Sequence, residues 1–185
     1  MTALVPVGLY LGAFPDGRGH WTRLGALVHE VRRGAEVEVL TGEEYTAWLL
    51  AHDTDTERVG SDGLATARER LIERGLLVES PRGDTAVTVF ARTYRIMPLL
   101  LGLGPSGSVA GWFAIGSPDR ELVSVPPVTY EIWSCAPAYP TLWEACASLV
   151  APAGSDPVRV VEAVLRDLHH LLSCTGAYVD PAVDR

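Results

Sequence analysis

The sequence predicts an α+β protein built from two similar units in tandem, and three observations support this prediction. Hydrophobic residues make up 48% of the 185 residues, which is sufficient for a core without disulfides. Both halves of the chain contain short stretches of alternating apolar and polar residues, followed by stretches with helical periodicity. Several sequence patterns also occur twice. We therefore place one unit at residues 1–92 and the other at residues 93–185.

The repeated patterns follow one another in the same order in both halves. A chance match between common hydrophobic patterns is the alternative explanation, but the shared order favours a duplication. The matching pairs are residues 6–12 and 98–104, residues 36–40 and 121–125, Tyr45-x-x-Trp48 and Tyr130-x-x-Trp133, and residues 75–79 and 176–180.

The first half predicts a hairpin followed by helices. Val28–Glu30 and Glu36–Leu40 flank a short turn that contains glycine, which is typical of a β-hairpin. Thr41 is a suitable N-cap for a helix that ends near His52. A short middle helix is expected within Asp55–Gly60.

A further helix is expected to begin at Asp62 and to end at Gly75, because Gly75 is a suitable C-cap. Leu76–Glu79 and Thr85–Phe90 flank a segment that contains proline and glycine. These residues predict a second hairpin, or wing, over residues 76–90.

The second half predicts a strand, a hairpin, three helices and a last strand. Trp112–Gly116 and Glu121–Val125 flank a turn that contains proline. The helices are expected over Pro127–Cys135, over Thr141–Val150 after a capping box, and from Pro157 to a residue shortly before position 176.

This order of elements resembles the PqqD-like precursor-peptide recognition elements, a family of winged-helix domains. The resemblance is carried by Glu121–Val125, Tyr130–Trp133, Thr141–Ala145 and Leu165–Gly176. It implies two tandem winged-helix-like units, each with a strand and a hairpin followed by three helices and a C-terminal strand or wing. It also implies that the protein recognises a peptide.

The charge of the chain disfavours nucleic acid as a partner. The 15 basic residues are all arginine, the 23 acidic residues give a net charge of −8, and lysine, asparagine and glutamine are absent. The two candidate recognition helices have no excess of positive charge, which neutralisation of phosphates requires. We therefore predict a non-enzymatic adaptor that binds a peptide or protein partner. A winged-helix DNA-binding transcriptional regulator is the alternative.

An exposed hairpin edge can pair with an extended peptide, while a groove beside the third helix contacts the peptide's side chains. The edges expected here are Glu36–Leu40 and Glu121–Val125. These two edges could instead pair with each other, which would bury both. The candidate partner-binding residues are Val37, Val39, Leu64, Arg68, Arg70, Leu122, Ser124, Arg159 and Arg166.

No catalytic motif is present, and we predict no catalytic residue, cofactor or metal, although residues that meet only in space could still form an active site. Gly102–Gly107 matches the GxGxxG dinucleotide pattern, and Glu121 follows at a distance suited to a ribose ligand. A helix should follow the third glycine, but a strand is expected there, so a plain loop is favoured. The aromatics at helical spacing could line a ligand groove, but a role in the core is favoured.

The first residues lack the features of a signal peptide, and no apolar run reaches the roughly 20 residues of a membrane-spanning helix. The three cysteines are an odd number without CxxC spacing, which fits a reducing compartment. We therefore expect a cytoplasmic protein without a membrane partner, as a monomer or a homodimer.

Overall fold

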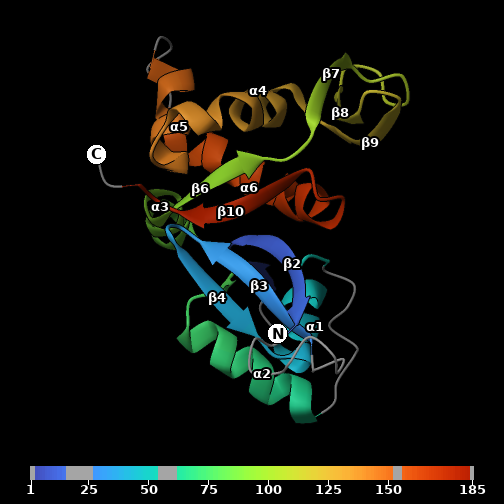
Figure 1. Cartoon of the computed structure of the whole chain (residues 1–185). Coiled ribbons are helices and arrows are strands. Elements are labelled where there is room, and N and C mark those ends of the chain that lie inside the picture. Colours follow the sequence, from blue (N-terminus) through green and yellow to red (C-terminus); the bar gives the residue numbers. More distant parts are fainter. Residues whose placement is uncertain (1–2, 16–26, 54–61, 152–155, 184–185) are drawn as a thin grey trace. The chain divides into compact units, whose positions relative to one another are not determined.

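The computed structural model describes residues 3–15, 27–53, 62–151 and 156–183. The chain divides into a first unit, Met1–Ser80, and a second unit, Pro81–Arg185. Each unit contains helices and small antiparallel sheets (Figure 1), so the predicted α+β class is confirmed. Residues 81–92 belong to the second unit, so the division lies earlier than the predicted one after residue 92.

The first unit has two sheets. Strand β1 (Leu4–Pro6) pairs with β5 (Leu77–Glu79), which brings the beginning and the end of the unit together. Strands β2 (Leu9–Pro15), β3 (Leu27–Arg33) and β4 (Glu36–Leu40) form the other sheet, with β3 in the centre. The predicted hairpin is therefore confirmed, and β4 is a terminal strand of its sheet.

Two helices of the first unit, α1 (Gly42–Leu50) and α2 (Asp62–Glu73), pack against each other. Helix α1 begins with a capping box between Thr41 and Glu44. The short helix expected within residues 55–60 lies outside the described residues. The core consists of apolar side chains from the strands and both helices, namely Val31, Leu40, Ala47, Trp48, Leu64, Ala67, Leu71, Leu76 and Leu77.

The second unit also has two sheets. Strand β6 (Tyr94–Pro98) pairs with β10 (Ala177–Pro181), and these strands lie side by side in Figure 1. Strands β7 (Leu101–Pro105), β8 (Phe113–Ser117) and β9 (Arg120–Val125) form the other sheet, with β8 in the centre. Strand β9 is therefore terminal in its sheet, as β4 is in the first unit.

The helices of the second unit pack around one apolar core. The three predicted helices are confirmed as α4 (Pro127–Cys135), α5 (Leu142–Val150) and α6 (Pro157–Ser173). A short 3₁₀ helix, η2 (Ala136–Ala138), follows α4. Fully buried side chains of this core include Ile96, Ile115, Ile132, Leu142, Leu168, Leu171 and Leu172.

The predicted wing hairpin over residues 76–90 is wrong. Residues 77–79 form β5, which pairs with β1 and not with a following strand. Asp84–Thr93 forms helix α3, with Val87, Phe90 and Ala91 buried on one face. The β-branched residues of this segment favour a strand locally, but burial of a helical face overrides that preference.

The two units have the same strand-pairing pattern. In each unit the first strand pairs with the last, and the next three strands form a sheet with the middle strand in the centre. A register shift also occurs at equivalent places, between Tyr10 and Gly12 and between Gly102 and Gly104. This pattern allows positions in the two units to be compared one by one.

The pairing corrects the predicted match between residues 75–79 and 176–180 by one position. Leu77 lies opposite Pro6, and Ala177 lies opposite Pro98. Gly75 therefore corresponds to Thr175, and both follow a helix with a positive φ, of 68° and 55°. Among the described residues, Thr175 is the one non-glycine residue with a positive φ.

Candidate functional site

Strand β4 exposes two of the predicted partner-binding side chains. Val37 is 52% exposed and Val39 is 50% exposed, whereas Leu40 is buried. Each three-stranded sheet forms within one unit, so β4 and β9 do not pair with each other in the described part of the chain.

The edge of β4 is occupied by an arginine that follows α2. Arg74 Nη2 donates a hydrogen bond to Glu38 Oε2 at 2.7 Å and another to the Val39 carbonyl at 3.0 Å. Arg33 Nη2 lies 3.3 Å from Glu36 Oε2 and 3.7 Å from Glu38 Oε1. A backbone carbonyl of this terminal strand is therefore already bound by a side chain of the same unit.

The same arginine extends this network to α1. Glu44 is only 6% exposed, and its Oε1 lies 3.2 Å from Arg70 Nε and 3.4 Å from Arg74 Nη1. Burial raises the pKa of Glu44, but the backbone hydrogen bond from Thr41 and the charges of Arg74 and Arg70 outweigh it, and the pKa lies below its usual value. We call this set the arginine–glutamate network: Arg33, Glu36, Glu38, Glu44, Arg70 and Arg74.

Strand β9 differs from β4 by one extra residue. Leu40 and Val125 are the last residues of their strands, and the pairing is equivalent back to Glu38 and Val123. The register of β9 then shifts, so that Glu121 lies opposite Gly116 and Leu122 is the extra residue. The predicted match of residues 36–40 with residues 121–125 is therefore corrected at its beginning. Glu121 corresponds to Val37 and not to Glu36.

The predicted residues Leu122 and Ser124 have different surroundings. Leu122 is 39% exposed on the terminal strand. Ser124 lies opposite Ala114 in the register, on the same face of the sheet as Glu121. Among the described residues, no side chain donates a hydrogen bond to a β9 carbonyl, unlike the arrangement at Val39.

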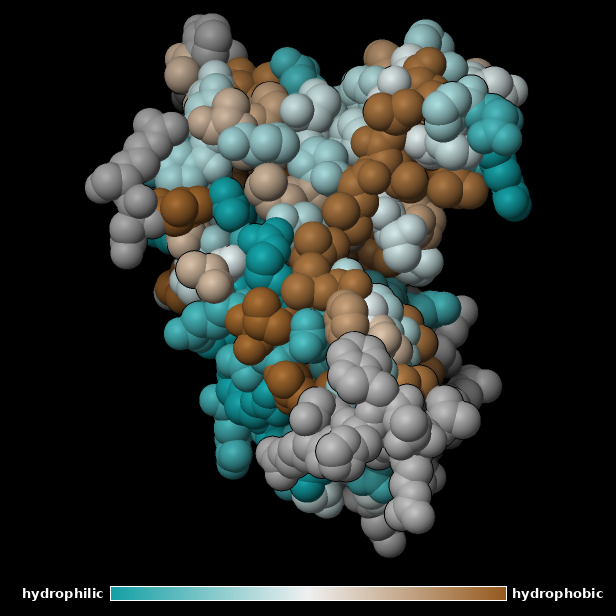
Figure 2. All heavy atoms as spheres, in the orientation of Figure 1, coloured by the Kyte–Doolittle hydropathy of each residue, from teal (hydrophilic) through white to brown (hydrophobic). Residues whose placement is uncertain are grey.

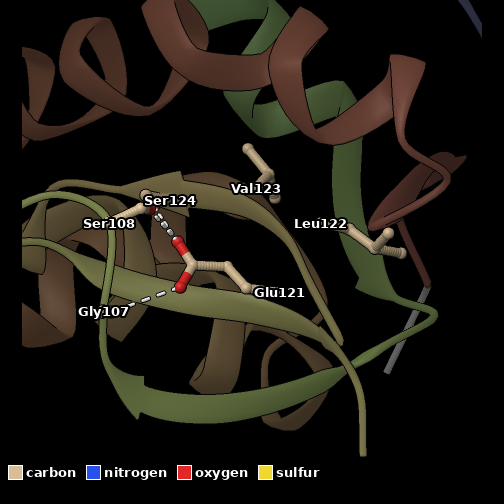
Figure 3. Close-up of a pocket in the computed structure, with 6 residues that line it drawn as sticks. All are labelled: Gly107, Ser108, Glu121, Leu122, Val123 and Ser124. Carbon is tan, nitrogen blue, oxygen red and sulfur yellow. Dashed lines mark hydrogen bonds between the residues drawn. The ribbon is translucent and has the colours of Figure 1, made fainter. Parts of the chain in front are cut away.

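A loop between β7 and β8 is tied to β9 through Glu121. Oε1 of Glu121 accepts hydrogen bonds from Ser106 Oγ at 2.8 Å and Ser108 Oγ at 2.5 Å. The Ser124 hydroxyl donates to the same oxygen, and the Gly107 amide donates to Oε2 at 3.3 Å. Figure 3 shows this carboxylate turned toward Ser108 and Ser124. We call residues 106–109 the serine loop.

The hydrogen bonds stabilise the charged form of Glu121. Those from Ser108, Ser124 and Ser106 lower its pKa to about 2. The carboxylate therefore carries a full negative charge at neutral pH. The serine loop is followed by β8 and not by a helix, which confirms the plain-loop interpretation of the GxGxxG pattern.

A hollow of about 370 Å³ lies along β9 beside the serine loop. In Figure 3 the Glu121 carboxylate faces the loop, while Val123 points toward the helices. The hollow thus combines a charged and hydroxyl-rich wall with apolar side chains. Its lining residues are Gly107, Ser108, Glu121, Leu122, Val123 and Ser124.

The other predicted partner-binding residues do not gather at these edges. Leu64 is 9% exposed and belongs to the hydrophobic core, so the prediction that it contacts a partner is wrong. Arg70 is held in the arginine–glutamate network, while Arg68 is half-buried on α2. Arg159 pairs with Glu162 at 3.1 Å, and Arg166 is exposed on α6.

The aromatic side chains form part of the packing in both units. Trp48 and Trp133 are each 3% exposed, which confirms the prediction that they belong to the core. The Trp48 indole donates to the Val7 carbonyl at 3.3 Å, and the Trp133 indole donates to the Gly176 carbonyl at 2.9 Å.

The aromatic layers of the two units differ at one place. Tyr10 Oη lies 2.9 Å from His29 Nδ1, and the His29 ring stacks on Tyr45 at 3.8 Å. The position of Tyr10 is taken in the second unit by Gly102, where an added Cβ would lie 2.2 Å from the hydroxyl oxygen of Tyr130. Gly102 therefore leaves the space that the Tyr130 ring needs.

The cysteines lack the features of a nucleophilic site. Cys135, Cys146 and Cys174 form no disulfide. Burial raises the pKa of Cys146 to about 12, so its thiolate is not formed at neutral pH. This agrees with a packing role for that side chain.

Comparisons with protein-family models, curated proteins and solved structures give no match. Within the described ranges, no helix combines the length and apolarity needed to cross a membrane. The same ranges contain no group of three or more histidine, cysteine or acidic residues placed to hold a metal ion.

Figure 2 shows exposed apolar side chains, in brown, where Figure 1 labels β7. Leu101 is 54% exposed and Leu103 is 37% exposed on this strand. Strand β7 is the opposite terminal strand of the sheet that contains β9.

Proposed function

We propose that this protein is a non-enzymatic binding protein that takes up an extended peptide segment of a partner protein as an additional strand beside β9. The observation that carries this proposal is the position of β9 at the end of its sheet, with a hollow along it. A terminal strand presents backbone N–H and C=O groups that a peptide can pair with.

The bulge in β9 gives further support. A β-bulge redirects a side chain and is common beside functional sites. Here the extra residue is Leu122, which is 39% exposed next to the hollow. An apolar side chain at this place can contact a docked peptide without belonging to the core.

The shared pairing pattern favours a duplication of one winged-helix-like unit. In this interpretation, the last helix of each unit follows the three-stranded sheet in sequence and contributes to the groove. Helix α6 contacts β9 in the second unit. The resemblance to PqqD-like elements agrees with a peptide as the partner.

The two units are not equivalent as binding sites in this proposal. Arg74 of the first unit corresponds to Cys174 of the second, because they directly precede the equivalent residues Gly75 and Thr175. The Cys174 thiol donates to Leu171 within its own helix end, whereas Arg74 donates to the Val39 carbonyl of β4. We therefore assign peptide binding to the second unit and a supporting role to the first.

The alternative, a DNA-binding regulator, has less support. Arg70 and Arg74 at the end of α2 are paired with Glu44 and Glu38, so their charges are neutralised within the unit. Arg159 on α6 is likewise paired, with Glu162. Binding to phosphates needs positive charge that is not already compensated.

A selection experiment tests the proposal. A phage-displayed library of random peptides is selected on the full chain, and the affinities of the recovered peptides are measured by fluorescence anisotropy. Leu122→Asp should weaken binding at least about tenfold, because a charge would replace an apolar contact. Val37→Asp, on the terminal strand of the other sheet, is the matched control and should leave affinity unchanged.

Hydrogen exchange locates the bound peptide. Backbone amides of residues 120–125 should exchange more slowly in the complex, while those of residues 36–40 should not change. Failure to recover any binding peptide would refute the proposal. Tight binding of duplex DNA at about 150 mM salt, together with no peptide binding, would favour the regulator instead.

A further inference from the structure

The hollow beside β9 has an uncompensated negative charge. No ion pair of Glu121 occurs among the described residues, although several other carboxylates have arginine partners. Its Oε1 already accepts three serine hydroxyls, but its Oε2 accepts only the Gly107 amide, at 3.3 Å. Oε2 has two lone pairs and one donor, so it can accept a further donor.

The serine hydroxyls complete a wall of acceptors. Each donates its hydrogen to Glu121. Ser106 Oγ also accepts the amides of Ser108 and Val109, whereas Ser108 Oγ and Ser124 Oγ keep lone pairs that can accept a further donor. An anionic group would be repelled by Glu121, and an apolar group would remove water from these oxygens without replacing its hydrogen bonds. An ammonium or guanidinium group has only donors, so it matches this wall.

The other wall of the hollow is apolar. Leu122 and Val123 line it next to Glu121. Side chains of an added strand alternate between the two faces of the sheet. A peptide beside β9 would therefore place one side chain near Glu121 and Ser124 and its neighbour on the opposite face.

We propose that the hollow lined by Glu121, Ser108 and Ser124 binds a lysine or arginine side chain of the docked peptide, which makes the second unit selective for extended segments with a basic residue next to an apolar one. This inference rests on the proposed function, because it specifies the chemistry of the partner at the same strand edge. The equivalent place of the first unit lacks these polar groups, since Val37 and Val39 stand where the second unit has Glu121 and Ser124.

The test uses the random peptide library on the full chain and on its Glu121→Gln variant. Peptides selected on the unchanged protein should be enriched in lysine or arginine at one fixed position, and this enrichment should disappear on the variant. The affinity of a lysine-containing peptide should fall at least about tenfold on Glu121→Gln. The same peptide with norleucine in place of lysine should bind both proteins equally.

Two further variants separate charge from loop structure. Glu36→Gln makes the same change of charge on the first unit and should leave selection unchanged. Ser108→Ala removes one acceptor of the hollow but keeps the charge of Glu121, so it should weaken binding of the lysine peptide less than Glu121→Gln does. A larger loss for Ser108→Ala than for Glu121→Gln would overturn the inference. Circular dichroism shows whether each variant is folded. If Glu121→Gln does not fold, Glu121→Asp, which keeps the negative charge, is compared with Glu121→Ser, which removes it.

The outcomes distinguish the two proposals. Peptides that depend on Leu122 but show no preference for a basic residue would overturn the inference and leave the proposed function standing. Equal affinity of the lysine peptide for the unchanged protein and for Glu121→Gln would also overturn it. Recovery of no binding peptide would refute both proposals.

Discussion

Replacement of Thr175 by glycine should stabilise the second unit. Thr175 has a φ of 55°, in the left-handed region, whereas Gly75 has a φ of 68° at the equivalent position of the first unit. The surrounding hydrogen bonds match, because Gly176 N donates to the Leu171 carbonyl at 2.7 Å and Leu76 N donates to the Leu71 carbonyl at 2.8 Å. The same helix end is therefore built once with the preferred residue and once without it.

The expected gain follows from two opposing effects. Left-handed backbone costs a residue with a Cβ about 1–2 kcal/mol. Glycine also increases the conformational entropy of the unfolded chain, which lowers the free energy of unfolding by about 0.4–1 kcal/mol and offsets part of the gain. The hydrogen bond from Thr175 Oγ1 to the Cys174 carbonyl, 2.7 Å long, is exposed to water, so its loss has little effect. Thr175→Gly should therefore raise the free energy of unfolding by about 0.5–1 kcal/mol.

Native-state hydrogen exchange measures this gain for each unit separately. Amides of α6 and β10 should become more protected in Thr175→Gly, while amides of α2 and β5 serve as an internal reference. The reverse substitution, Gly75→Thr, should lower protection in the first unit by about 0.5–1 kcal/mol, for the same two opposing effects, and leave the second unit unchanged. Unchanged or reduced protection of α6 in Thr175→Gly would refute the assignment of strain to Thr175.

Three further predictions concern the second unit. Arg95→Met should cost about 3 kcal/mol in urea denaturation, because it removes a guanidinium that lies 2.9 Å from the carboxylate of Asp180, whose side chain is 0% exposed. A loss below about 0.5 kcal/mol would contradict this. The folded-state pKa of Glu121 is lowered to about 2, so the serine loop should be fully held above the ordinary glutamate pKa of about 4.3 and released only as the pH falls toward 2. Carboxyl NMR checks this, and a Glu121 midpoint near pH 4 would argue against the serine hydrogen bonds. Gly102→Ala should destabilise by about 1 kcal/mol, because the new Cβ meets the Tyr130 hydroxyl at 2.2 Å, and Tyr130→Phe in the same chain should recover part of that loss if the clash is the cause.

Elements defined by local signals were predictable from the sequence. Thr41, Thr141 and Asp156 each accept a hydrogen bond from a backbone amide of the helix that follows. An N-cap depends on residues within one turn, so the sequence contains all the information that it requires. The two terminal strands were predictable for the same reason, since alternation and turn residues are local properties.

The segment of residues 84–93 shows where local information is insufficient. Its threonine and valine residues favour a strand, and it follows a turn that contains proline and glycine. The choice of helix depends on Val87, Phe90 and Ala91 being buried. Contacts of α3 with α5 and α6, which come much later in the chain, provide that burial.

The details of the candidate site could not be predicted from neighbouring residues in the sequence. Leu122 and Ser124 were predictable as residues of an edge strand, but the bulge that separates their roles depends on pairing with β8. The serine loop precedes β9 by a whole strand, and Arg74 reaches Val39 from the far end of α2. Two serines close together in a glycine-containing loop are the signal that the sequence offers, and it does not show that Glu121, on the predicted edge, is their hydrogen-bond acceptor.

The two terminal strands β4 and β9 differ in how their edges are covered, and the proposed function gives a reason for this difference. An uncovered terminal strand is a risk, because it can pair with other chains, and proteins usually block such edges with charge or side-chain contacts. Arg74 does this for β4 by binding the Val39 carbonyl. On β9 the serine loop binds the Glu121 side chain and leaves the backbone carbonyls without a side-chain donor among the described residues. An edge that serves only for support gains from the first arrangement, whereas an edge that must accept a strand requires the second.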